Sequence, residues 1–213
     1  RITLQLQQRY PDLPVFLFGH SMGSMIARLY LSKYSSLLRG VVLCGTAGPN
    51  PASKAGMLLC RKIIASKGPM AHSVQLYKLI FGSYNRRYDH PKTEFAWLSR
   101  DDEMVNAYIA DPLCGFEFTA SAYLDLLCLQ YYCNTRLWYK TLDQNLPMLM
   151  ISGSMDPVGN YGKGIMQIER QLTKASIHDL TVWLYPQARH ELLNETNRDE
   201  VMRDVLSWFA LHL

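Results

Sequence analysis

Residues 19–23 read Gly-His-Ser-Met-Gly, and they decide the fold because they lie between a strand pattern and a helix start. Upstream, residues 14–18 (PVFLF) are short, apolar and β-favouring, which indicates a strand buried on both faces. Downstream, apolar residues recur at helical spacing: Met22, Met25, Ile26 and Leu29. The chain must therefore turn sharply from strand to helix at Ser21. A serine in such a turn needs small residues two positions before and two positions after it, and Gly19 and Gly23 occupy these positions. The pattern predicts that Ser21 is an exposed nucleophile; a glycine-rich structural turn is the alternative.

A candidate acid and a candidate base follow at two further strand ends. Residues 146–153 (LPMLMISG) read as a buried strand, and the segment that follows it, residues 154–157 (SMDP), contains Asp156. Residues 180–185 (LTVWLY) read as the final strand, and His190 lies in the loop that leaves it. Functional side chains of open α/β sheets gather at the carboxyl ends of the strands. The order serine, aspartate, histidine therefore predicts a catalytic triad, although Asp-Pro also starts ordinary turns.

This triad would carry out acyl transfer. Ser21 would attack an acyl carbonyl, and His190 would take its proton and return it to the leaving group. Asp156 would fix the tautomer of the imidazole and stabilise the imidazolium. The backbone N–H of Met22 opens a helix, so it is the expected donor to the oxyanion.

The other titratable residues are poorer candidates. His20 adjoins the nucleophile on the strand, and we expect it to point elsewhere. Glu191 is too close in sequence to His190 to orient its ring. The remaining histidines lie in the insertion described below or in polar or helical surroundings: His72, His90, His178 and His212. No histidine pairs with a cysteine or carboxylate at metal-ligand spacing, so we expect no metal and no cofactor.

Three segments resemble one branch of the α/β-hydrolases. Residues 16–24 (FLFGHSMGS), 153–159 (GSMDPVG) and 188–195 (ARHELLNE) are similar to lysophospholipases and monoacylglycerol lipases, the serine aminopeptidase S33-like branch. Residues 93–119 are similar to bacterial members of that branch. The resemblance implies an α/β-hydrolase fold, with a mostly parallel sheet and flanking helices. It also implies a carboxylic ester hydrolase for lipid-like esters, with Ser21, Asp156 and His190 as its triad.

The resemblance further implies that the chain begins late. In that family several strands, a helix and an oxyanion loop precede the elbow strand, whereas here this strand begins near Leu13. These elements would add roughly 80–100 residues. We therefore expect the strand at Val15–Phe18 to form an apolar sheet edge. A missing N-terminal segment or self-association would cover that edge.

A long insertion separates the nucleophile from the acid. Residues 40–45 (GVVLCG) read as the next sheet strand, yet Asp156 follows only much later. We expect hydrolase core in residues 1–48 and 143–213, and a helical cap or lid in residues 49–142. Helical segments are expected within this cap at Met57–Ala65, Ser73–Phe81, Asp101–Ile109 and Ala120–Tyr132. Their apolar faces would line an acyl pocket, or simply pack within the cap.

Composition limits the other possibilities. The 213 residues are 48% hydrophobic and 19% charged, which is typical of one globular core. The net charge of +4 is modest and its basic residues are scattered, so nucleic acid is not an expected partner. No apolar run is long enough to span a membrane, and transient contact with a lipid surface is the remaining membrane expectation. Five cysteines without a paired framework fit a reducing cytoplasm.

Two classes of function remain open. The first is an active serine hydrolase that cleaves carboxylic esters such as lysophospholipids or monoacylglycerols through an acyl-enzyme on Ser21; peptidases and thioesterases of the same fold share these residues. The second is a truncated, non-catalytic fragment that keeps the triad but needs a missing N-terminal segment.

Overall fold

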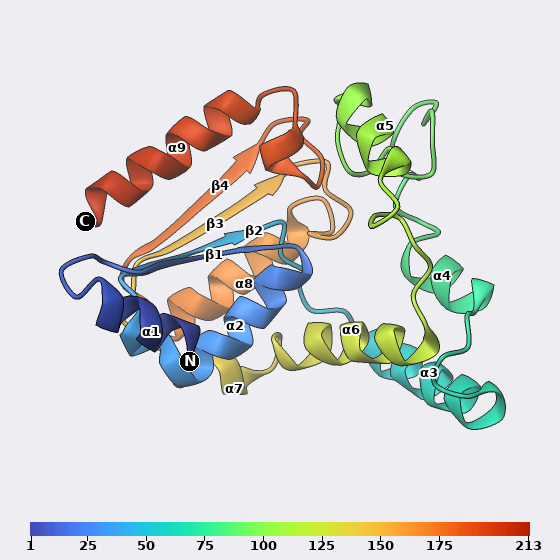
Figure 1. Ribbon diagram of the computed structural model, residues 1–213, viewed down its shortest axis with the longest axis horizontal. Helices are drawn as coiled ribbons and strands as arrows, with labels where there is room; N and C mark the ends of the chain where they lie inside the picture. Colours follow the sequence, from blue (N-terminus) through green and yellow to red (C-terminus); the bar gives the residue numbers. More distant parts are fainter.

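Four parallel strands form the centre of the molecule, and helices cover both of their faces. The computed structural model describes residues 1–213 (Figure 1). The strands pair in the order β1-β2-β3-β4, as β1 Phe16–His20, β2 Gly40–Cys44, β3 Met148–Gly153 and β4 Leu180–Tyr185. The helices are α1 Ile2–Arg9, α2 Met22–Tyr34, α3 Ser53–Lys67, α4 Val74–Ile80, α5 Asp102–Ala110, α6 Ala120–Tyr132, α7 Arg136–Tyr139, α8 Lys163–Lys174 and α9 Arg198–Leu211, with short 3-10 turns at Ser35–Leu37 and Leu192–Asn194. This is the predicted α/β-hydrolase architecture, and the predicted strands are confirmed to within about two residues at each end.

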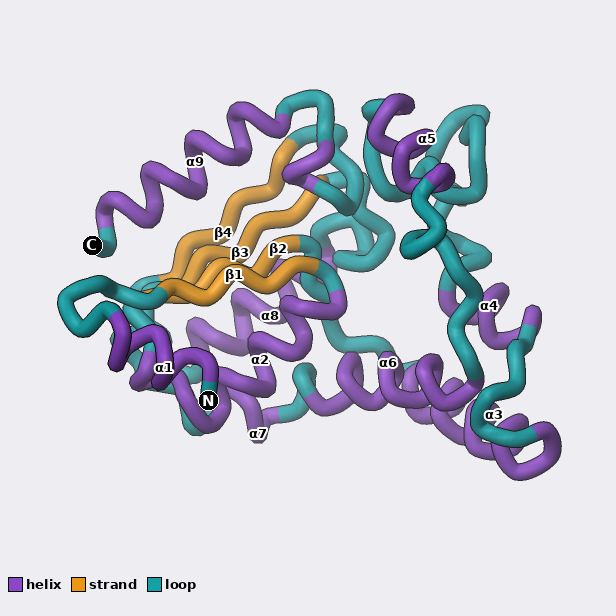
Figure 2. The backbone as a smooth tube through the Cα atoms, in the orientation of Figure 1, coloured by secondary structure: helices purple, strands orange, loops and turns teal.

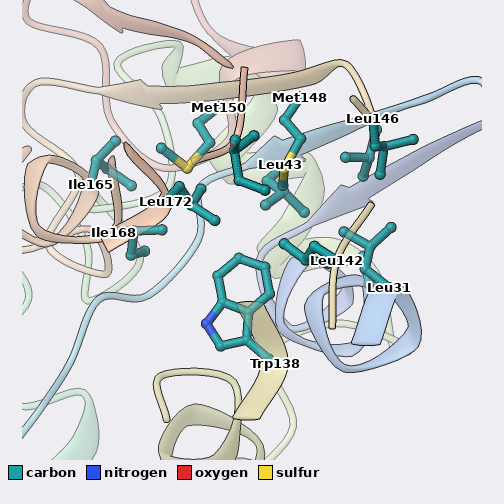
Figure 3. Close-up of a cluster of buried hydrophobic side chains, with 13 residues drawn as sticks. Leu31, Leu43, Trp138, Leu142, Leu146, Met148, Met150, Ile165, Ile168 and Leu172 are labelled. Atoms are coloured by element: carbon teal, nitrogen blue, oxygen red, sulfur yellow. The ribbon is translucent and has the colours of Figure 1, made fainter. Parts of the chain in front are cut away.

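The two central strands are buried along their whole length, because helices lie on either side of them. Successive side chains of a strand point to opposite faces. Leu43 and Met150 accordingly pack with α2 and α8 in one hydrophobic cluster (Figure 3). Val42 and Leu149 pack with α9 in a second cluster. This explains why these strands read as continuous apolar runs rather than as alternating ones.

All four strands run in the same direction, so their carboxyl ends lie at one edge of the sheet (Figure 1). The turns that carry the predicted site residues leave from that edge. At its sides the sheet ends with β1 and β4, and β1 pairs only with β2. The expectation that the strand before Ser21 lies at a sheet edge is therefore met.

Helices α3, α4, α5 and α6, all between β2 and β3, lie beside the sheet (Figure 2), whereas α7 packs against α2 through Trp138. Helices α3 and α6 pack closely against each other and share a hydrophobic cluster that includes Met57, Cys60 and Leu127. The four helical segments expected here are found as α3, α4, α5 and α6. None of the helices in the structure is both long and apolar enough to cross a bilayer.

A fully buried arginine joins this group of helices to α2, the helix that follows Ser21. Arg28, on α2, donates from Nη1 to the carbonyl of Ala47 at 2.9 Å and from Nη2 to Oδ1 of Asn134 at 2.9 Å. Nη2 also donates to the carbonyl of Cys133, and the guanidinium carbon lies 4.5 Å from the centre of the Trp138 ring. Burial lowers the pKa of Arg28. The cation is thus held by carbonyls and an aromatic face rather than by a carboxylate.

We expect Arg28→Met to reduce the free energy of unfolding by about 2 kcal/mol, because charged hydrogen bonds are lost while the buried carbonyls stay. The measurement is urea denaturation, in which the midpoint should fall while the m-value stays constant. Arg61→Met is the matched control, since Arg61 is exposed on α3. Equal midpoints for Arg28→Met and the parent chain would contradict the anchoring role of Arg28.

Candidate active site

Ser21 occupies the turn between β1 and α2 in a strained backbone conformation. Its φ is 53° and its ψ is −120°, a combination that residues other than glycine rarely adopt. Strain of this kind costs of order 1–3 kcal/mol and persists only where the surroundings enforce it. Here the backbone N–H of Ser21 donates to the carbonyl of Cys44 at 2.9 Å, which continues the pairing of β1 with β2 into the turn.

The two glycines around Ser21 differ in how much space the structure leaves for a side chain at their positions. A Cβ on Gly19 would lie 2.7 Å from the carbonyl oxygen of Gly23 and 2.9 Å from Cα of Ser24, which no side chain tolerates. A Cβ on Gly23 would meet no other part of the chain within 4 Å. The prediction that both positions must be small is therefore right for Gly19 and wrong for Gly23. The close approach of β1 and α2 therefore excludes a side chain at Gly19, on the strand side of the turn.

The structure brings the three predicted triad residues into one hydrogen-bonded chain. The Oγ of Ser21 lies 2.8 Å from Nε2 of His190, and Nδ1 of His190 lies 3.0 Å from Oδ2 of Asp156. A carboxylate only accepts, so Nδ1 of His190 carries the proton and Nε2 accepts from the hydroxyl of Ser21. The other oxygen of Asp156 accepts from the N–H of Val158 at 2.8 Å. Asp156 is fully buried and His190 almost so.

The side chain of His20 lies beside His190 rather than away from it. Its Nε2 lies 3.4 Å from the carbonyl oxygen of His190, and the two rings are 5.0 Å apart. Burial, followed by the neighbouring His190, lowers the pKa of His20. The expectation that His20 points elsewhere is wrong: side chains alternate only along extended backbone, and Ser21, with a φ of 53°, has left it, so Ser21 does not point to the face opposite His20.

A cavity of about 320 Å³ opens beside Ser21 and His190. That volume is in the range of small-molecule sites. Its lining is mostly hydrophobic, and aromatic side chains from the residues between β2 and β3 contribute much of it, among them Phe81, Trp97 and Tyr123. The ring of Trp97 lies 5.1 Å from that of His190. No lysine or arginine lines the cavity, and Glu191 is its one carboxylate.

Met22 is the first residue of α2, directly after Ser21. Its backbone N–H belongs to the first turn of a helix, where the N–H groups have no partner within the helix. This is the position expected for a donor to an oxyanion. No group of three or more histidine, cysteine or acidic side chains is arranged so that it could hold a metal ion.

A serine on a strand-to-helix turn, joined to a histidine and an aspartate at the ends of later parallel strands, defines the α/β-hydrolase class. The sequence model of one family in this class, serine aminopeptidase S33, matches residues 2–197. The chain belongs to this family.

Individual relatives agree with this assignment. The chain is 26% identical over 210 residues to a monoacylglycerol lipase of Mycolicibacterium smegmatis and 27% identical over 211 residues to a monoglyceride lipase of Mus musculus. Each alignment covers 96% of this chain, which spans 65% and 61% of those two relatives. A thermostable carboxyl esterase of Bacillus coagulans, solved with glycerol, superposes with a TM-score of 0.90 at 30% identity, over 98% of this chain and 68% of that one.

Proposed function

We propose that this protein is a serine hydrolase that cleaves carboxylic esters of uncharged, lipid-like molecules, with Ser21, His190 and Asp156 as its catalytic triad. The observation that supports it most is the hydrogen-bonded chain from Ser21 through His190 to Asp156 beside an apolar cavity. The curated relatives named as monoacylglycerol and monoglyceride lipases support the same substrate class.

The acylation step follows from the direction of the hydrogen bonds. As Oγ of Ser21 attacks the ester carbonyl, its proton passes to Nε2 of His190, and the N–H of Met22 donates to the oxyanion that forms. Collapse of the tetrahedral intermediate breaks the bond to the leaving alcohol. That alcohol takes the proton back from Nε2, which leaves an acyl-enzyme on Ser21 and a neutral imidazole.

Deacylation repeats the sequence with water. Water gives a proton to Nε2 of His190 and attacks the acyl carbonyl, and the proton then returns to Oγ of Ser21 as the fatty acid leaves. Asp156 stabilises the imidazolium in both steps. Since Asp156 is fully buried and also accepts from Val158, its position is fixed before substrate binds.

Because the lining of the cavity is mostly hydrophobic, it favours burial of the acyl chain of the substrate over burial of a polar group. We propose that residues 49–142 act as a cap, because the aromatic residues of the cavity come largely from them. Their apolar area would be covered by methylene groups, each worth about 0.8 kcal/mol on burial.

The charge of the residues that line the cavity distinguishes between the two candidate head groups, glycerol and the phosphate of a lysophospholipid. A phosphate beside Ser21 would find no lysine or arginine in the cavity and would face Glu191. An uncompensated charge in such surroundings costs several kcal/mol. The cavity therefore supports a glycerol head group over the phosphate of a lysophospholipid.

A substrate panel tests this preference. With matched acyl chains, we expect kcat/KM for a monoacylglycerol to exceed that for a lysophosphatidylcholine at least about 10-fold. p-Nitrophenyl esters of increasing length measure the acyl preference in the same assay. A preference for the lysophospholipid, or an optimum at acetate, would contradict the proposed substrate. Faster cleavage of amides or thioesters would favour a peptidase or thioesterase.

We also propose that the protein works in the reducing cytoplasm and contacts lipid surfaces only transiently. All five cysteines are free thiols, and three of them are buried. Burial raises the pKa of Cys44, which keeps this thiol protonated beside the site. These features support a structural rather than a redox role for the cysteines.

A further inference from the structure

The backbone of the predicted catalytic histidine is hydrogen-bonded to a segment from the insertion. The N–H of His190 donates to the carbonyl of Trp97 at 3.3 Å, and the N–H of Glu191 donates to the carbonyl of Leu98 at 2.8 Å. Residues 97–98 lie between α4 and α5, far in sequence from the loop that carries His190. The position of the imidazole therefore depends on what holds this segment in place.

A buried carboxylate lies where the two segments meet. Glu195 is fully buried, and its Oε1 accepts from the N–H of Arg189 at 2.8 Å and from the N–H of Arg100 at 3.1 Å. Its Oε2 accepts from Nε of Arg100 at 2.8 Å and from the N–H of Thr196 at 2.9 Å. Arg189 directly precedes His190, so one oxygen of Glu195 holds both the residue before the histidine and the segment that packs on it.

Further contacts close the same junction. Nη1 of Arg189 donates to the carbonyls of Ala96 at 2.6 Å and Ser99 at 2.9 Å, and the guanidinium stacks on the ring of Tyr88 at 4.4 Å. Oγ of Ser99 donates to the carbonyl of Asn194 at 2.8 Å. We call residues 96–100 and 189–196 together the histidine clasp.

The chemistry of the clasp requires an ionised carboxylate. Every group directed at Glu195 is a donor, and a carboxylate is the side-chain group that only accepts. An amide of the same shape would turn its NH₂ toward one of these donors and leave a buried N–H without a partner.

We propose that Glu195 is a positioning residue, which fixes the backbone of His190 against residues 97–100 and thereby sets the hydrogen bond between His190 and Ser21. This inference rests on the catalytic role proposed above for His190. It makes the contact of the cap with the histidine loop a part of the catalytic geometry. Displacement of the clasp would move Nε2 of His190 relative to Oγ of Ser21 without removing any member of the triad.

The test compares Glu195→Gln with Asp102→Asn in the full chain. Asp102 forms an exposed ion pair with Lys92 close to the clasp, so the second change also turns a carboxylate into an amide. For Glu195→Gln we expect both kcat and the rate of labelling by a fluorophosphonate to fall about 100-fold per folded molecule, with KM within about threefold. Asp102→Asn should match the parent in both rates. The folded fraction is measured by circular dichroism.

A spectroscopic readout separates this proposal from the proposed function. We expect the proton on Nδ1 of His190, hydrogen-bonded to Asp156, to give a downfield NMR signal in the parent chain, and we expect this signal to shift or broaden in Glu195→Gln. A parent chain that shows this signal but is not labelled would contradict the proposed function alone. The positioning role is then decided by the change of that signal in the variant.

Two results would overturn the positioning role. One is a folded Glu195→Gln variant with the parent's labelling rate and NMR signal. If that variant does not fold, Glu195→Asp keeps the negative charge but withdraws both oxygens by one methylene from the N–H groups of Arg189 and Arg100, and a folded variant with parent rates would again refute it. Failure of both variants to fold would assign Glu195 to stability rather than to positioning.

Discussion

Replacing Ser21 by alanine is expected to lower kcat for ester hydrolysis about 10⁶-fold while the chain stays folded. The substitution removes Oγ, the one group within 2.8 Å of Nε2 of His190 that can form an acyl-enzyme. Alanine keeps the Cβ and the backbone conformation of the turn, so the β1–α2 packing should persist. Ester hydrolysis and fluorophosphonate labelling measure the loss, and circular dichroism measures folding.

The matched control for this prediction is Ser36→Ala, which removes a hydroxyl from an exposed position outside the site. It should hydrolyse esters and react with the probe at the parent rate. Labelling that persists in Ser21→Ala would show that another residue is the nucleophile. A parent chain that is folded but neither labelled nor active would favour the alternative of a non-catalytic fragment.

The parts of the site that follow from local sequence could be predicted. Ser21, Asp156 and His190 each come at the end of a short apolar run, and parallel strands bring their carboxyl ends to one edge. Strand direction and chain order therefore place these residues near one another before any side-chain contact is known. The fold class and its strands were predictable for the same reason.

His20 shows where the local rule fails. Alternation along a strand predicts that neighbours point to opposite faces, which would turn His20 away from Ser21. The rule applies to extended backbone, and it ends at Ser21, whose φ is 53°. The sequence signals a turn there, but it does not specify in which direction that turn points the side chain of Ser21 relative to His20.

Glu195 and Trp97 could not be assigned a role from the sequence. Glu195 lies in a polar stretch that reads as an exposed loop, yet it is fully buried because Arg100, more than ninety residues earlier, supplies its partner. Trp97 reads as one aromatic residue among many, and it is the pairing of its carbonyl with His190 and the position of its ring beside that histidine that place it in the site. Contacts between segments so distant in sequence depend on how the insertion packs, which neither periodicity nor motif spacing encodes.

Replacing Asp156 by asparagine is expected to lower kcat about 10⁴-fold with little effect on KM. The amide can turn its NH₂ toward Nδ1 of His190 and keep its oxygen for the N–H of Val158. Nδ1 then accepts instead of donating, so the proton moves to Nε2, which can no longer take the proton of Ser21. The amide also lacks the negative charge that stabilises the imidazolium.

Asp179→Asn is the matched control, because Asp179 forms the other aspartate–histidine pair of the chain, 3.1 Å from Nε2 of His212 and partly exposed. Steady-state kinetics should place this variant within about twofold of the parent, since exposed pairs contribute little. Equal losses in the two variants would mean that the Asp156 effect is not specific to the site. Activity of Asp156→Asn near the parent level would contradict the assignment of Asp156 as the residue that orients His190.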